Sequence, residues 1–153
     1  MTEPVAETVV RHLRAGRDGA LATISAHASI EGFPFGSVVP YALDGAGRPL
    51  LFLSDIAQHT RNLMADPRAS LLVRGEADGD AQATWRVTLI GRMEQHESAE
   101  DLARYVAVVP DAESYRETHG FALWRMEIER IRFIGGFGNI HWVEPADFAS
   151  ACA

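Results

Sequence analysis

Two segments of the sequence alternate between apolar and polar residues with a period of two, and this pattern constrains the fold more than any other feature. They cover residues 83–95 and 123–133. Successive side chains of a β-strand point to opposite faces, so the alternation predicts strands with one face in a core and the other toward solvent. The apolar sides consist of Trp85, Val87, Leu89 and Met93 in the first segment, and of Trp124, Met126 and Ile128 in the second.

Shorter apolar runs predict further strands, and amphipathic stretches predict helices. We expect strands at residues 20–25, 36–42, 49–53, 69–74 and 139–143, and helices at residues 3–15, 58–65, 98–109 and 111–118. Pro40 places the 36–42 strand at an edge or a bulge. Because helices do not alternate with strands as in βαβ units, we predict a mainly β (α+β) fold. It is an antiparallel barrel of six to seven strands, closed or half-closed, with short flanking helices.

Composition and charge exclude several classes of function. The 153 residues suffice for one domain over residues 1–153. The net charge of -7 argues against nucleic acid or an anionic membrane surface as a partner. The apolar runs are far shorter than the ~20 residues of a membrane helix. The N-terminus has no signal-peptide pattern, and Cys152 is the one cysteine, in a tail expected to be frayed. We therefore expect a soluble cytoplasmic protein.

Polar side chains gather between the predicted strand 49–53 and the predicted helix 58–65. The start of a helix offers backbone N–H groups and a favourable dipole to an anion, and a guanidinium can bind phosphate with two hydrogen bonds. One interpretation is a phosphate-binding site with Arg61 as its main cation. The alternative is a surface helix that carries a solvated arginine. The residues concerned are Ser54, His59, Thr60, Arg61 and Asn62.

A glycine-rich bend at residues 135–138 precedes His141 and Trp142. The third glycine of a dinucleotide fingerprint is missing, and residues 142–145 are interpreted as unable to open a helix, so a Rossmann fold is rejected. The bend either turns a tight corner or places His141 and Trp142 beside a ligand. The histidines have no zinc-type spacing, and no serine lies in a nucleophile elbow. The sequence therefore indicates neither a metal site nor nucleophilic hydrolysis.

In combination, these segments resemble the FMN-binding split-barrel superfamily, the group of pyridoxamine 5'-phosphate oxidase. The resemblance spans most of residues 16–95, and residues 135–143 are similar to the haem-utilisation (HugZ-like) branch, whose members bind or degrade haem. The matching segments are Gly19-Ala20-Leu21-Ala22-Thr23, Gly32-x-Pro34-Phe35-Gly36-Ser37, Leu53-Ser54, His59-Thr60-Arg61-Asn62-Leu63, Asp66-Pro67-Arg68-Ala69-Ser70-Leu71-Leu72 and Leu89-Ile90-Gly91.

This resemblance implies a split barrel that forms a homodimer and holds FMN in the cleft between its subunits. It places the strand segment Ser37-Val38-Val39 along the isoalloxazine ring. Arg86 stands where the oxidases have an FMN-contacting glutamine, so its guanidinium would face the flavin oxygens or the phosphate. Arg61 becomes the phosphate clamp, and the hydrogen-bonding residues around it are Ser54, His59, Thr60 and Asn62.

Three functions are compatible with the sequence. The first is an FMN-binding oxidoreductase that acts on a small-molecule substrate, with Trp142 also beside the cofactor. The second is a haem-binding or haem-degrading protein, for which His141 is a better candidate ligand than His59 because it lies in the closing motif. The third is a barrel without a cofactor that serves only as a partner module. Flavin chemistry belongs largely to the cofactor, so the lack of an obvious acid or base does not separate them.

Overall fold

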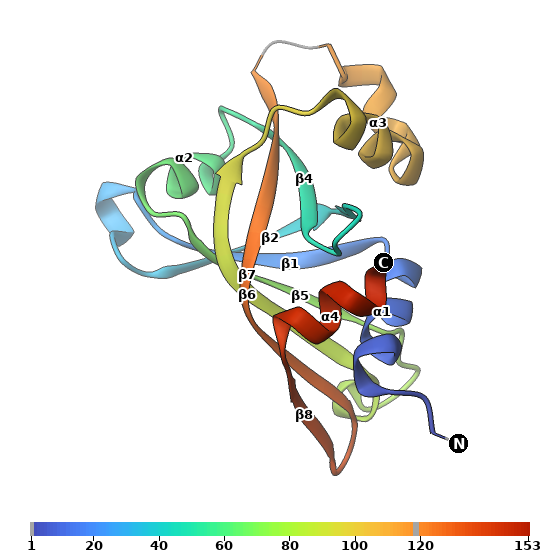
Figure 1. Ribbon diagram of the computed structural model, residues 1–153. Helices are drawn as coiled ribbons and strands as arrows, with labels where there is room; N and C mark the ends of the chain where they lie inside the picture. Colours follow the sequence, from blue (N-terminus) through green and yellow to red (C-terminus); the bar gives the residue numbers. More distant parts are fainter. Residues whose placement is uncertain (1, 118–119) are drawn as a thin grey trace.

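The computed structural model describes residues 2–117 and 120–153 and consists of one curled antiparallel sheet with helices at its ends and on one face (Figure 1). The strand order is β2-β1-β5-β6-β7-β4-β3, and β8 pairs with β7. This is an α+β split barrel, as predicted. The strands are β1 (Asp18–Ile24), β2 (Pro34–Pro40), β3 (Ala42–Leu43), β4 (Pro49–Ser54), β5 (Arg68–Arg74), β6 (Arg86–Gln95), β7 (Phe121–Gly136) and β8 (Asn139–Val143). The helices are α1 (Val5–Ala15), α2 (Gln58–Ala65), α3 (Ala99–Val108) and α4 (Pro145–Cys152).

The main core lies on the concave face of the sheet, under α1 and α4. Paired residues on adjacent strands lie on the same face of the sheet. One row of paired residues, one from each of six strands, faces this core. Helix α1 adds Val9, Val10 and Leu13, and α4 packs beside it with Phe148 buried (Figure 1). The Arg14 Nη2 atom donates to the Cys152 carbonyl at 2.9 Å. The row consists of Ser37, Leu21, Leu71, Leu89, Ile131 and Val143, all buried except the half-buried Ser37.

A smaller apolar cluster fills the other end of the barrel. It lies under α3 and the short 3₁₀ helix Pro110–Tyr115 that follows it. Phe52 of β4 is its centre, and its ring lies 6.0 Å from Tyr105, 5.9 Å from Tyr115 and 5.4 Å from Phe121, measured between ring centroids. Edge-to-face and offset aromatic pairs of this kind fasten α3 to the sheet.

The long strand β7 contains a β-bulge that the sequence analysis did not predict. Ile90 pairs with Arg130 and Gly91 pairs with Ile128, so Glu129 is the extra residue. The β7 residues buried in the main core are therefore Trp124 and Met126, at even positions, and Ile131 and Phe133, at odd positions; Leu123 is buried in the smaller cluster. The prediction of an uninterrupted alternation over residues 123–133 was wrong at this point, because a bulge puts two successive residues on one face.

Several predicted boundaries also moved. The predicted 36–42 strand is split at Tyr41 into β2 and β3, which explains eight strands where six to seven were expected. As Pro40 indicated, β2 is an edge strand. The predicted 83–95 strand begins only at Arg86, after a 3₁₀ turn at Ala81–Ala83. The predicted 111–118 helix is the 3₁₀ helix ending at Tyr115, and its last residue lies outside the described residues.

The end of the chain corrects two expectations. Residues 142–145 do open a helix, since α4 starts at Pro145 with Glu144 as its N-cap. Proline suits the first helical position, where its missing N–H would have had no intrahelical partner. Cys152, expected in a frayed tail, is buried at the end of this helix. No helix among the described residues combines the length and apolar character that a membrane crossing requires.

Candidate functional site

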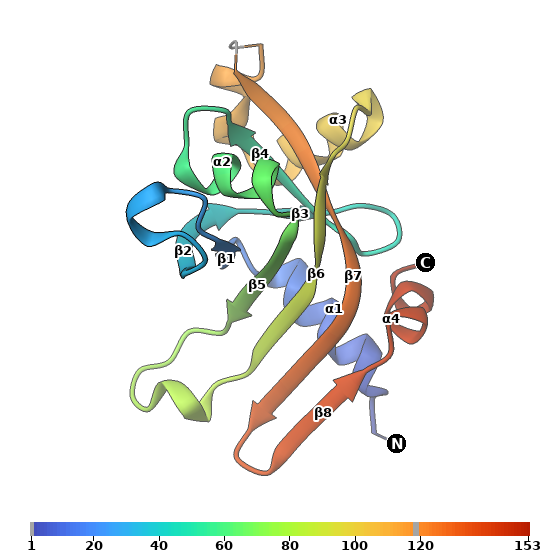
Figure 2. The ribbon, with the colours of Figure 1, turned by 90° about the vertical axis from the view of Figure 1, so that its left-hand side faces the viewer.

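The convex face of the sheet is the candidate site, because no helix covers it across β5, β6, β7 and β8 (Figure 2). The row of paired residues adjacent to the buried row lies on this face and includes one residue from each of the same six strands. Its side chains form a mostly apolar band: Val38 is 78% exposed, Leu72 38% and Trp142 52%. The row consists of Val38, Ala20, Leu72, Thr88, Arg132 and Trp142.

Arginines gather along the same face. Arg74 pairs with Arg86 across β5 and β6, and Arg130 and Arg132 lie two residues apart on β7. Among the described residues, none of these four guanidiniums forms an ion pair with a carboxylate. Their neighbours Arg68 and Arg92 are paired, with Asp66 at 2.6 Å and Glu129 at 3.0 Å. These four arginines thus concentrate positive charge on part of the convex face, in a protein whose net charge is -7.

Small residues leave shallow hollows between the larger side chains of this face. One hollow of about 340 Å³ lies over Ala22, Ser70 and Ile90. Another of about 380 Å³ lies beside Val38 and Leu72, and the residues that line it include Arg74 and the carboxylates of Asp18 and Glu76. Apolar side chains next to a few charged donors are typical of sites for flat organic cofactors. The convex face can therefore take a planar, conjugated ligand that carries acidic groups.

The predicted phosphate residues around α2 are only partly available to a ligand. Asn62 is fully buried, and its Oδ1 accepts hydrogen bonds from the Ala26 N–H and the Gln58 side chain, both at 2.9 Å. Its Nδ2 donates to the Thr23 hydroxyl at 3.0 Å. The bonds to Thr23 and Ala26 attach α2 to β1 and to the segment that follows it, so Asn62 has a structural role in this fold.

The other four residues of this group differ in their burial and in their hydrogen-bond partners. Thr60 is buried and its hydroxyl has no partner among the described residues. His59 is half-buried, and burial lowers the pKa of its imidazole, so the neutral ring is favoured. Arg61 is exposed in the first turn of α2, and the Ser54 hydroxyl accepts from the Ile56 N–H at 3.4 Å. Arg61 is the cation of this group that faces solvent.

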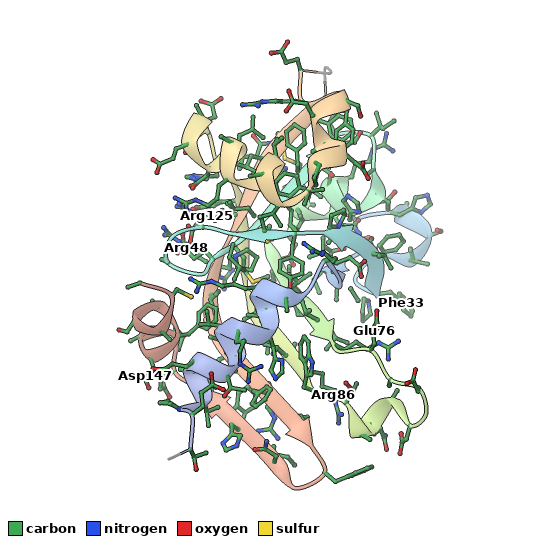
Figure 3. The ribbon with its side chains drawn as sticks, turned by 90° about the vertical axis from the view of Figure 1, so that its right-hand side faces the viewer. Phe33, Arg48, Glu76, Arg86, Arg125 and Asp147 are labelled. Atoms are coloured by element: carbon green, nitrogen blue, oxygen red, sulfur yellow. The ribbon has the colours of Figure 1, made fainter. Side chains whose placement is uncertain are left out.

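The strand predicted to lie along a flavin ring does not present its three residues together. Val38 is on the convex face, whereas Val39 is buried on the concave side and Ser37 is half-buried there. Arg86 is half-buried, and its Nη1 donates to the Gln82 carbonyl at 2.8 Å (Figure 3). The Arg86 side chain thus holds the loop between β5 and β6 while it borders the convex face.

His141 and Trp142 are on opposite faces of β8. The Trp142 ring is on the convex face, with the Arg130 Cζ 4.4 Å and the Arg132 Cζ 4.7 Å from its centroid. The His141 ring stacks on buried Phe133, and its Nε2 lies 2.5 Å from the Asn139 Oδ1. His141 borders an open hollow of about 540 Å³ between α1 and α4, near Asp147 (Figure 3). A flat ligand on one face of the sheet would contact only one of the two rings.

Arg74, Arg130 and Arg132 were not among the site residues predicted from the sequence. The signal for them is present, because each occupies a polar position of an alternating strand. Taken singly, an arginine on a polar strand face is most simply a solvated charge. Only the pairing of β5, β6, β7 and β8 brings them to one surface.

The family model for the CREG β-barrel matches residues 4–150, nearly the whole chain. The chain belongs to the CREG-like β-barrel family. This family is part of the FMN-binding split-barrel superfamily that the sequence resembles. Mouse protein CREG1 is 25% identical over 146 residues, which cover 85% of this chain and 66% of CREG1.

Two relatives more than 30% identical have names that refer to haem. The non-canonical haem oxygenase HOZ of Arabidopsis thaliana is 33% identical over 121 residues, covering 77% of this chain and 36% of HOZ. A haem-binding protein from Mycobacterium smegmatis is 34% identical, with a TM-score of 0.87 over 98% of this chain and 62% of that protein. This CREG-like chain therefore spans less than two thirds of either relative.

A FAD-binding protein from Mesorhizobium loti shares the fold of this CREG-like chain, with a TM-score of 0.64 and 22% identity over 84% of this chain and 90% of that protein. At this identity the comparison shows a shared fold and nothing more. Among the described residues, no three His, Cys, Asp or Glu side chains are grouped so as to hold a metal ion.

Proposed function

We propose that this CREG-like protein binds haem on the convex face of its sheet, as a homodimer with the cofactor between the subunits. The observation that carries the proposal is the combination of an apolar band with four arginines that have no carboxylate partner among the described residues. Haem is a flat apolar ring with two propionate carboxylates, and this face offers a surface for each part. The names of the Arabidopsis and mycobacterial relatives support the same choice.

The residues of the convex face fit the ring and the acidic groups of haem. They do not supply a histidine that could ligate its iron. Leu72 and Val38 would contact the ring, and the arginines would bind the propionates. The strand residues of this face include no histidine. His141 could ligate the iron only from the other face of β8. Bound haem iron would supply the O₂ and electron chemistry of any haem degradation.

The experiment is an absorption titration of the purified protein with hemin. We expect a saturable Soret band in the wild type and a loss of affinity of about tenfold or more in Leu72→Glu, because a carboxylate would enter the apolar band. Val108→Glu is the matched control, since Val108 on α3 is 39% exposed against 38% for Leu72. Hemin binding unaffected by Leu72→Glu would remove the convex face from the proposal. Loss of the band in His141→Ala would move the site to the α1 side of β8.

A second candidate function, an FMN-dependent oxidoreductase acting on a small molecule, is favoured by Arg61. This exposed guanidinium lies in the first turn of α2, and anions are stabilised at helix starts. Removing a charge-assisted contact to phosphate should weaken FMN binding about tenfold or more in Arg61→Ala. Arg11→Ala on α1 is the control. A flavin titration in which wild type and Arg61→Ala bind FMN equally would exclude Arg61, and no uptake of FMN by the wild type would exclude this function.

The remaining expectations stay parts of the proposal. Residues 1–153 are proposed to act as one domain, which a single cooperative unfolding transition would support. The cytoplasmic location is proposed from the sequence alone, and cell fractionation tests it.

A further inference from the structure

We infer that Arg130, Arg132 and Trp142 form the subsite for the acidic groups of the cofactor, namely the propionate carboxylates of haem. This inference rests on the proposed function and assigns its charge recognition to three residues. None of them lies in the α2 region where the sequence predicts anion binding. Three features of these residues support this assignment: the arrangement of their side chains on β7 and β8, the charge of the two guanidiniums, and their position beside the apolar band.

The three side chains form one cluster on the convex face. Trp142 of β8 is the direct cross-strand neighbour of Arg132, and Arg130 lies two residues earlier on β7. Both guanidinium carbons lie over the indole, 4.4 and 4.7 Å from its centroid. A guanidinium that stacks on a ring uses its flat side, and its in-plane N–H groups remain free to donate. These cation–π contacts with the indole favour a defined position for both guanidiniums, whose N–H groups can still donate to an anion.

The charges of this cluster are not neutralised within the chain. Among the described residues, neither Arg130 nor Arg132 forms an ion pair, and Glu129, the bulge residue just before Arg130, is paired with Arg92 at 3.0 Å. Two adjacent cations repel each other, and the repulsion is strongest where water is displaced. An anion bound between them would remove this repulsion and accept charge-assisted hydrogen bonds.

The cluster borders the apolar band. Thr88 separates Arg132 from Leu72 in the cross-strand row, and Ile90 is the neighbour of Arg130. Adjacent strands are about 4.8 Å apart, so Arg132 is roughly 10 Å from Leu72 across the sheet. A flat ring on β1, β5 and β6 would thus direct its acidic edge toward β7. Haem carries its carboxylates at one edge of an apolar ring, and the convex face carries its arginines at one edge of the apolar band, so the two arrangements match.

The test compares hemin with hemin dimethyl ester, in which both carboxylates are blocked. We expect the wild type to bind hemin about tenfold or more tightly than the ester, and Arg130→Gln/Arg132→Gln to bind the two equally with unchanged affinity for the ester. Arg68→Gln is the matched control on the same face, because Arg68 is already paired with Asp66 and lies on β5, away from the cluster. Trp142→Ala should reduce the preference for hemin, and Trp142→Phe, which keeps a ring, should restore it.

The outcomes separate this inference from the proposed function. Equal binding of hemin and its ester by the wild type, or a full preference for hemin in the double variant, overturns the subsite and leaves haem binding intact. No binding of either porphyrin overturns both. A parallel titration with FMN and riboflavin tests phosphate as the anion: a preference for FMN that is lost in the double variant would replace propionate by phosphate as the group bound here.

Discussion

At the scale of single residues, the polar side chains of α2 divide between the fold and the surface. The amide of Asn62 makes three hydrogen bonds inside the protein, to Ala26, Gln58 and Thr23. A buried amide is tolerated only when it is hydrogen-bonded. One helical position away, Arg61 points to solvent. Of these two neighbours, only Arg61 is free to bind a ligand without loosening the attachment of α2.

We therefore predict that Asn62→Ala destabilises the protein without any cofactor present. The loss should be about 2–3 kcal/mol in the free energy of unfolding, because the Thr23 hydroxyl and the Ala26 N–H would lose their buried partner. Urea unfolding of the apo-protein measures it. Gln58→Ala is the control, since it removes only one of the three bonds. An unchanged free energy of unfolding in Asn62→Ala would contradict the structural role.

His12 makes stability depend on pH. Its ring stacks on Trp85 at 4.2 Å, and burial, assisted by nearby Arg11, lowers its pKa from the ordinary 6.5; burial does the same for the pKa of His59. Below pH 6.5 the unfolded chain binds more protons than the folded one, so stability falls as the pH drops from 6.5 toward the folded-state pKa. The urea midpoint should decrease between about pH 7.5 and about pH 5.5. His12→Gln should show a smaller decrease; an equal one would refute the prediction.

At the scale of elements, the bulge in β7 determines which residues lie on the convex face. Glu129 is the extra residue, so Arg130 and Arg132 follow it onto the convex face while Ile131 and Phe133 enter the core. The sequence carries a trace of it, since the apolar residues of this segment change from even positions (124, 126, 128) to odd ones (131, 133). A change of parity in a strand is the expected signature of one inserted residue.

Gly91 opposite the bulge should tolerate no side chain. A Cβ atom there would collide with the backbone carbonyl of Glu127 on β7, which cannot move without breaking the ladder. Gly91→Ala should cost about 3 kcal/mol of stability, as overpacking of a core does. Thermal or urea unfolding measures the loss. Gly79→Ala is the control, because nothing lies within 4 Å of the corresponding Cβ. Equal stability of the two variants would contradict the close approach.

At the scale of the whole molecule, one sheet separates two different surfaces. Its concave face is filled by α1, α4 and the core, and its convex face exposes the apolar band. An exposed apolar surface of this kind usually marks a binding site or an interface. The proposal assigns both roles to it, with a cofactor and a second copy of the chain on the same face.

If the convex face is the interface, a charge introduced into its apolar band should separate the subunits. We predict that the wild type sediments as a dimer and that Val38→Glu is a folded monomer, because two buried carboxylates would face each other or the apolar band. Sedimentation velocity measures the mass. Ile56→Glu is the matched control, since Ile56 is 76% exposed against 78% for Val38 but lies outside the sheet. A dimer that persists in Val38→Glu would place the interface elsewhere.

By itself, the sequence determined the kind of fold. The alternating segments, the edge strand marked by Pro40 and the family resemblance were enough to predict an antiparallel split barrel, because these signals arise within a few neighbouring residues. Arg61 was predicted to bind an anion in the same way, from local helix chemistry, and this stays a prediction. The helix after Pro145 and the bulge in β7 were missed, although both have local signals.

The tertiary structure decided which residues act together. Trp142 meets Arg130 and Arg132, and not its neighbour His141, because of the register between β7 and β8. Asn62 belongs to the fold because β1 and the segment after it supply partners from more than thirty positions away. A shift of one residue in register would move each strand side chain to the other face. Strand register is fixed by packing between distant segments, so the composition of the convex face depends on the whole sheet.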